Sequence, residues 1–151
     1  MRRLILLALA GLAGCGEPVA DNHFANSIEI ERGEPAPVTV DSVPVRIGEL
    51  GASFNACNAA GTTRNLAEGG ALPVRAAPFD AAEETGTIPA GTRFFVCTRS
   101  HDQDWMGVVF HEGGTLDPSC GVSGPVTARR NYEGPCRSGW VSSAFVKLVA
   151  G

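Results

Sequence analysis

The fold class follows from residues 85–96, which read Thr-Gly-Thr-Ile-Pro-Ala-Gly-Thr-Arg-Phe-Phe-Val. Pro89 fixes one backbone dihedral angle and Gly91 permits a positive one, so the stretch predicts a tight turn. This turn ends a long polar loop that we expect over residues 78–92. A strand should follow at Arg93–Thr98, where aromatic and β-branched side chains gather.

Short apolar runs of the same kind continue through the rest of the chain, and glycine or proline separates them. No apolar period of 3.6 residues lasts long enough for a substantial helix. We therefore expect an all-β domain, and the small number of runs suggests a small barrel. The other expected strands are Leu72–Arg75, Trp105–Phe110, Gly139–Ser142 and Phe145–Val149.

The first fifteen residues have the composition of an export signal. Arg2 and Arg3 precede an apolar run at residues 4–14, which is too short to cross a hydrocarbon layer of about 30 Å. The run ends in Leu-Ala-Gly-Cys at 12–15, which resembles the lipobox of bacterial lipoproteins. The resemblance implies that residues 1–14 are removed and that Cys15 carries lipid and anchors the chain to a membrane. The alternative is an ordinary secretory signal in which Cys15 has no role.

The residue after the predicted lipidated cysteine bears on location. Gly16 occupies that position. In enteric-type lipoproteins, the absence of aspartate there is associated with passage to the outer membrane. The resemblance therefore implies a lipid-anchored protein of the cell envelope that faces the periplasm from the outer membrane.

Charge argues against nucleic acid as a partner. The chain has 12 basic and 16 acidic residues, and loss of Arg2 and Arg3 with the signal leaves a net charge of −6. The excess is concentrated in residues 16–50, which also contain four prolines and no sustained apolar period. We expect residues 15–50 to be the lipidated cysteine and a flexible tether, and residues 51–151 to be the folded domain.

Four motifs in the expected domain are similar to those of bacterial SH3-type (SH3b) domains. The resemblance implies an SH3-like barrel with a long first loop and a short 3₁₀ turn in its closing segment. This chain departs from the family by an N-terminal extension and by an insertion at residues 111–138, before the last strands, where relatives have a tight turn. The matching motifs are LPVRAAP at 72–78, TGTIPAGTRFFV at 85–96, WMGVV at 105–109 and SGWVSSAFVKL at 138–148.

The remaining four cysteines predict two disulfides, because their number is even and the chain is expected to be exported. Cys120 and Cys136 both lie in the insertion, where a bridge would stabilise a loop that is otherwise improbably long. That pairing leaves Cys57 for Cys97. Four cysteines allow three pairings, so the sequence does not fix this one. No Cys-X-X-Cys pair is present, and we expect no metal site.

The second bridge has a structural consequence. Alternation and the family match together place Phe94 and Val96 inside the barrel, so Phe95 and Cys97 should face outward. A bridge from Cys97 would then hold residues 43–66 on the outside of the barrel.

The SH3b resemblance also implies ligand contacts, because aromatic residues line a groove beside the long first loop in that family. Trp105, Trp140 and Tyr132 are the candidates, although Trp140 has the alternative role of covering the core. Arginines near Tyr132 suit carboxylate-bearing ligands such as cell-wall peptides, the alternative being that they are solvated loop residues. These arginines are Arg129, Arg130 and Arg137.

Catalysis is not expected. Ser100, His101 and Asp102 are adjacent, and neighbours in an extended segment point to opposite faces and cannot form the nested hydrogen bonds of a triad. No pattern points to a cofactor. We therefore expect a membrane-anchored binding module whose ligand is peptidoglycan or an envelope protein. The alternative is a structural or inhibitory protein that docks through the disulfide-closed insertion.

Overall fold

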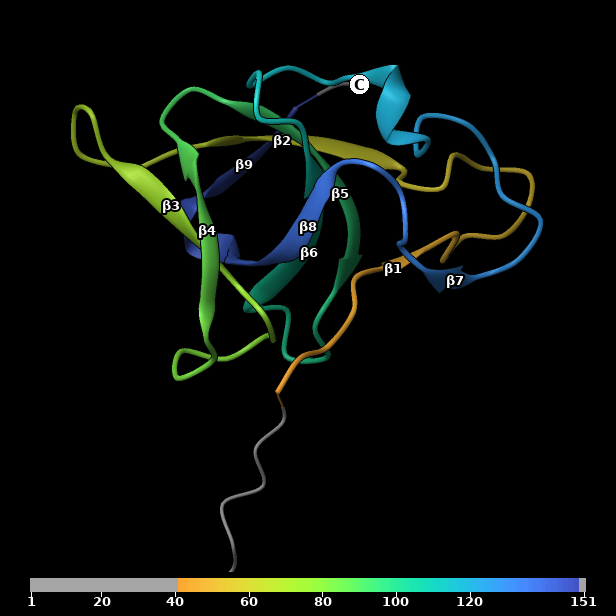
Figure 1. Cartoon of the computed structure of the whole chain (residues 1–151), viewed down its shortest axis with the longest axis horizontal. Helices are drawn as coiled ribbons and strands as arrows, with labels where there is room; N and C mark the ends of the chain where they lie inside the picture. The colour runs from red at the N-terminus through yellow and green to blue at the C-terminus, as the bar shows by residue number, and fades with distance from the viewer. Residues whose placement is uncertain (1–40, 150–151) are drawn as a thin grey trace, which may run out of the picture. The chain divides into compact units, whose positions relative to one another are not determined.

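Antiparallel strand pairing organises residues 41–149, the part of the chain that this computed structural model describes. Seven strands form one sheet in the order β4-β3-β8-β6-β5-β2-β9, and β1 and β7 form a second, two-stranded sheet (Figure 1). The expected signal peptide, Cys15 and most of the tether lie outside the described residues. The strands are β1 (Arg46–Ile47), β2 (Ala59–Thr63), β3 (Ala71–Arg75), β4 (Glu84–Pro89), β5 (Arg93–Arg99), β6 (Trp105–Phe110), β7 (Arg130–Asn131), β8 (Arg137–Ser142) and β9 (Val146–Val149).

The fold is all-β, as the sequence predicted. Within residues 41–149 the only helical elements are two 3₁₀ turns, η2 (Pro118–Cys120) and η3 (Ser143–Phe145). The second of these lies in the closing segment, between β8 and β9, where a 3₁₀ turn was expected. In this part of the chain no helix has the length and hydropathy needed to span a membrane.

The seven-stranded sheet curls around a single apolar core, but its two outermost strands, β4 and β9, do not pair with each other (Figure 1). The sheet is therefore open, and the expected closure into a complete barrel is not seen. Ten buried residues fill the concave side, and they come from β3, β4, β5, β6, β8 and β9. They are Leu72, Val74, Ile88, Phe94, Val96, Met106, Val108, Phe110, Val141 and Val146.

Strands β5 and β6 are buried on both faces, which accounts for their unbroken apolar sequence. Phe94 and Val96 face the core, whereas Phe95 and Cys97 face a second apolar cluster on the outer side of the sheet, as predicted. The N-terminal segment and the insertion cover that outer side. Their contributions to the second cluster include Val45, Ile47, Ala56, Cys57, Cys120 and Val122.

Both predicted disulfides are present. Cys57 is bonded to Cys97, and Cys120 is bonded to Cys136. The first bridge holds the N-terminal segment against the outer face of β5. The prediction that the whole of residues 43–66 lies on that outer face was wrong, because residues 59–63 form β2 and pair with both β5 and β9 inside the main sheet.

Two strands of the main sheet were missed in the sequence, and each has a physical reason. The short strands β1 and β7, of two residues each, were not expected either. Strand β4 lies in the stretch expected to be a polar loop; only its Ile88 is buried, because it is an edge strand that pairs with β3 alone. Strand β2 contains only alanine, glycine and threonine. Its Gly61 must be small, since a Cβ there would lie 2.8 Å from Phe94 Cε2 in the core.

The folded part begins earlier than the expected boundary at residue 51. Val45 and Ile47 are each 2% exposed, and Arg46–Ile47 pairs with Arg130–Asn131 of β7. Residues 42–50, expected to be the last part of the tether, therefore pack as part of the domain.

Candidate functional site

The SH3b resemblance implied that Trp140 lines a ligand groove, but this side chain is buried against the N-terminal segment of the domain. Trp140 is 4% exposed, and its indole Nε1 donates a hydrogen bond to the carbonyl oxygen of Val43 at 2.6 Å. The Val43 amide donates in turn to the carbonyl oxygen of Ala76, at the start of that loop. Trp140 therefore packs as a core residue and holds residues 42–45 in place.

Trp105 is also buried, with 8% of its surface exposed. It begins β6, and its amide and carbonyl groups both bond to Ser100, which closes the hairpin between β5 and β6. Ser100 also donates to the carboxylate of Asp102, and this bond, followed by one from the Asp104 amide, lowers the pKa of Asp102. Ser100, His101 and Asp102 therefore belong to a hydrogen-bonded turn.

Two of the three candidate arginines are engaged with acceptors. Arg129 pairs with Glu49 at 3.3 Å. Arg137 lies 5.7 Å from the ring centre of Phe110 and donates to the Thr85 carbonyl and to Glu112. The two side chains lie on different parts of the molecule, so the structure does not assemble the four-residue cluster that the sequence suggested.

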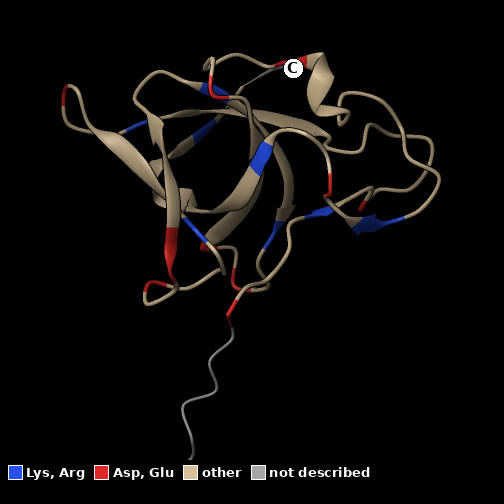
Figure 2. Ribbon diagram, viewed as in Figure 1, with Lys and Arg blue, Asp and Glu red and all other residues tan. Residues whose placement is uncertain are grey.

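Arg130 and Tyr132 do come together, and they line one pocket of about 310 Å³. The pocket is formed by β7 and the residues that follow it, against Ile47 of β1 and Cys120–Gly121 of the insertion. In Figure 2 the basic segments of β1 and β7 lie side by side at one end of the molecule. The volume of the Arg130–Tyr132 pocket lies within the range of about 300–1,000 Å³ that is usual for ligand sites.

Tyr132 makes this pocket rigid. Its hydroxyl donates to the Cys120 carbonyl at 3.0 Å and accepts from the Cys136 amide at 3.0 Å, so it bonds to both halves of the Cys120–Cys136 disulfide. Burial raises the pKa of Tyr132 above its usual value. The phenol is therefore neutral at physiological pH and keeps both hydrogen bonds.

Arg130 supplies the positive charge of the pocket. Its side chain is exposed and makes no ion pair or side-chain hydrogen bond with any residue in 41–149. A planar guanidinium with free donors can bind a carboxylate through two parallel hydrogen bonds. Glu133 also lines the pocket. This arrangement suits a ligand that carries a carboxylate together with a positive or hydrogen-bond-donating group.

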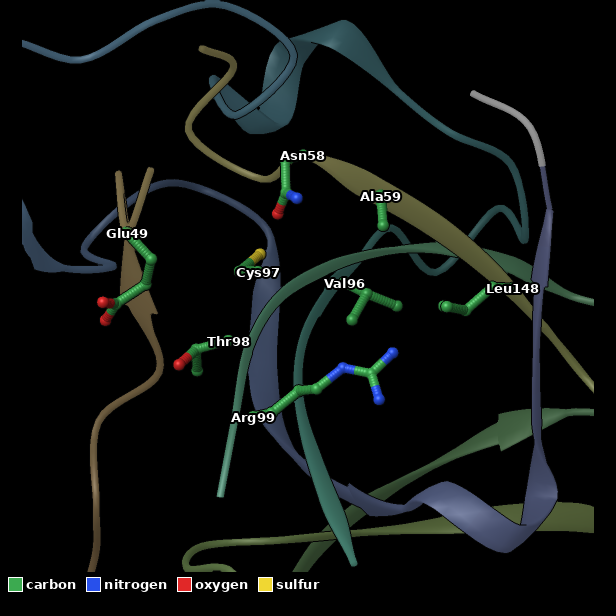
Figure 3. A pocket seen from close by; sticks show the side chains of 8 residues that line it. All are labelled: Glu49, Asn58, Ala59, Val96, Cys97, Thr98, Arg99 and Leu148. Atoms are coloured by element: carbon green, nitrogen blue, oxygen red, sulfur yellow. The ribbon is translucent and has the colours of Figure 1, made fainter. Parts of the chain in front are cut away.

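Sequence reasoning missed a second and larger cavity, of about 390 Å³, beside the end of β5. Arg99 and Leu148 line it with residues from β2 and from the segment after β1 (Figure 3). Arg99 stands in no motif, and Leu148 ends the SGWVSSAFVKL motif without being a site candidate; the two are brought together only by the sheet order. The available signal was local: Arg99 is a charged residue that directly continues an apolar strand.

Metal binding receives no support from residues 41–149, where no cluster of three or more His, Cys, Asp or Glu side chains is arranged to hold an ion. Comparison with known proteins does not assign the chain to a family: no family model, no characterised protein and no solved structure matches it.

Proposed function

We propose that this protein is a lipid-anchored binding module of the cell envelope, and that its ligand surface is the pocket of Arg130 and Tyr132. The ligand class is a carboxylate-bearing peptide, with the stem peptides of peptidoglycan as the leading candidate. The observation that carries this proposal is the exposed, unpaired guanidinium of Arg130 in a pocket made rigid by Tyr132 and the Cys120–Cys136 disulfide.

The proposed mechanism is tethered recognition. Lipid on Cys15 would hold the domain at a membrane, and the acidic stretch up to about residue 41 would set its reach, which raises the effective concentration of nearby ligands. The two disulfides support this location, because such bonds persist in oxidising compartments. No nucleic acid or cofactor has a part in the proposal.

We further propose that the domain is an SH3-like barrel in which the insertion has taken over ligand binding. The open curled sheet and the 3₁₀ turn between β8 and β9 support this reading. In this proposal residues 42–45 take the place of a ligand in the usual groove, and the bond from Trp140 to Val43 supports it. This favours docking through the insertion, which was the alternative from the sequence, over docking through the groove.

Co-sedimentation of the detergent-solubilised, oxidised chain with purified peptidoglycan sacculi tests the ligand. We expect the chain to pellet with sacculi and Arg130→Gln to lose about tenfold in affinity, as befits loss of a charged hydrogen-bonding partner. Lys147→Gln is the matched control, since Lys147 is exposed on β9 and has no side-chain partner among the described residues. Equal pelleting of all three proteins, or no pelleting, would contradict the proposal.

The membrane anchor has its own test. Replacement of Cys15 by serine removes the thiol to which lipid would be attached in the predicted lipobox. The variant is expected to leave the membrane fraction of fractionated cells, or to remain with its signal uncleaved, whereas the parent chain partitions into detergent. A variant that behaves like the parent would show that Cys15 carries no anchor.

A further inference from the structure

A β-bulge near the end of β5 changes the face of the sheet on which Arg99 lies. Val96 pairs with Val108 and Arg99 pairs with Met106, but the register shifts between Val96 and Thr98. Val96, Val108 and Met106 all belong to the core. Without the bulge, strict alternation from Val96 would place Arg99 on the outer face; with it, Arg99 lies on the concave face, opposite Met106. Bulges often occur beside binding sites for this reason.

The same part of β5 lacks a neighbouring strand on one side. Strand β6 pairs with β5 as far as Arg99, but β2 pairs only with Arg93–Val96. Strand β2 begins at Ala59 because Cys57 is bonded to Cys97 and its amide donates to the Val122 carbonyl in the insertion. The disulfide therefore directs the chain away and leaves the edge of β5 at Thr98–Arg99 uncovered.

A cavity of about 390 Å³ lies at this uncovered edge. Its apolar lining is made by Ala59, Val96 and Leu148, and Leu148 points toward Val96 in Figure 3. Leu148 is 45% exposed although it is a large apolar side chain. An apolar surface left open beside an unpaired strand edge can accept an extended peptide.

Charge in the cavity selects the peptide. Arg99 extends from β5 toward Leu148 (Figure 3) and makes no ion pair or side-chain hydrogen bond within residues 41–149. Glu49, the acidic group of the lining, is bound by both Arg46 and Arg129 at 3.3 Å. The cation available to a ligand is therefore Arg99.

We infer that this cavity is a second binding site, which takes the carboxyl end of an extended peptide with a small apolar terminal side chain. The peptide backbone lies along the free edge of β5, its terminal side chain contacts Val96 and Leu148, and its carboxylate binds the guanidinium of Arg99. The site shares no lining residue with the pocket of Arg130. This inference and the proposed function can therefore be tested independently.

The test is a titration of the ¹⁵N-labelled, oxidised full chain in detergent with acetyl-Ala-Val-Ala. One form of the peptide has a free carboxylate and the other has a terminal amide. We expect saturable shifts of the backbone amides of Thr98, Arg99 and Ala59 and of the Arg99 Nε signal with the carboxylate form. The amide form, and the Arg99→Gln variant with the carboxylate form, should bind about tenfold more weakly or worse.

Lys147→Gln is the control, since it removes an exposed positive charge elsewhere on the domain, and it should bind the carboxylate peptide like the parent chain. Arg130→Gln separates the two sites: it removes the cation of the other pocket, so the shifts of Thr98, Arg99 and Ala59 should remain those of the parent chain. Equal binding of the carboxylate and amide peptides, equal weakening by all three substitutions, or no saturable shift at millimolar peptide would overturn the inference. Loss of binding only in Arg130→Gln would also overturn it and assign the peptide to the other pocket.

Discussion

The indole nitrogen of Trp140 and the carbonyl oxygen of Val43 are separated by 97 positions in the sequence and by 2.6 Å in the structure. This bond ties the segment that enters the domain to β8, near the end of the chain. It also explains why a tryptophan that the SH3b resemblance placed in a ligand groove is 4% exposed. The backbone around Val43 therefore lies against the indole of Trp140.

Replacement of Trp140 by phenylalanine keeps an aromatic ring but removes the N–H donor. The Val43 carbonyl then loses its partner, and we expect the free energy of unfolding to fall by about 1–3 kcal/mol. Urea denaturation measures the loss, and hydrogen exchange at the Val43 amide, which bonds to Ala76, should accelerate. Unchanged stability and unchanged protection at Val43 would show that the bond contributes nothing.

The two disulfides should contribute unequally. Cys57–Cys97 joins residues 40 positions apart, and Cys120–Cys136 joins residues 16 apart. On the chain-entropy model, removing each bridge by paired alanine substitutions costs about 4 and about 3 kcal/mol, respectively. Denaturation of the two double variants measures the order, and a larger loss from Cys120–Cys136 would contradict the loop-length argument.

Gly61 in β2 should not tolerate a side chain. A Cβ there would lie 2.8 Å from Phe94 Cε2 and 3.0 Å from Val146 Cγ1. Gly61→Ala is therefore expected to destabilise the domain by about 1–3 kcal/mol through overpacking. The matched control is Gly124→Ala, because no atom lies within 4 Å of a Cβ at that position. Thermal unfolding of both variants checks the difference, and equal melting temperatures would refute it.

Tyr132 gives a pH dependence that can be assigned without ambiguity, since the chain has one tyrosine. Burial raises the pKa of Tyr132 above the usual value near 10, so the folded state holds the phenolic proton more tightly than the unfolded state. This contribution to stability is fully present below about pH 10 and is lost as the pH rises through the raised pKa.

Tyrosinate ultraviolet absorbance measures that titration directly. The native protein should ionise at a higher pH than the protein unfolded in urea with its disulfides intact. The alkaline loss of stability assigned to this group should be missing in Tyr132→Phe. Identical titration curves for native and unfolded protein would mean that Tyr132 is not shielded by the insertion.

Much of the main sheet could be predicted from the sequence because its central strands are buried. The bounds of β6 at Trp105–Phe110 were predicted correctly, and the alternation from Phe94 to Cys97 identified the two faces of β5. An apolar run between polar turns leaves few other arrangements. The predicted cysteine pairing used the same two faces: the SH3b resemblance placed Cys120 and Cys136 together in the insertion, and Cys97 on the outer face of β5 was then left for Cys57.

The edge strand β4, strand β2, the partner of Trp140 and the cavity of Arg99 depend on contacts that leave no local pattern in the sequence. Strand β4 buries only Ile88, and β2 is built of small residues whose size is set by Phe94 across the sheet. The partner of Trp140 is a backbone carbonyl, which any residue at position 43 would supply. The bulge that turns Arg99 toward Leu148 is a feature of strand register, so neither side chain marked the cavity.

The most direct test of the proposed function compares two forms of the same cell-wall material. Purified sacculi would be used either untreated or after conversion of their peptide carboxylates to amides. The account predicts that the oxidised chain pellets with untreated sacculi and that amidation reduces binding about tenfold, because Arg130 loses its anionic partner. Equal pelleting with both forms, or pelleting with neither, would contradict it.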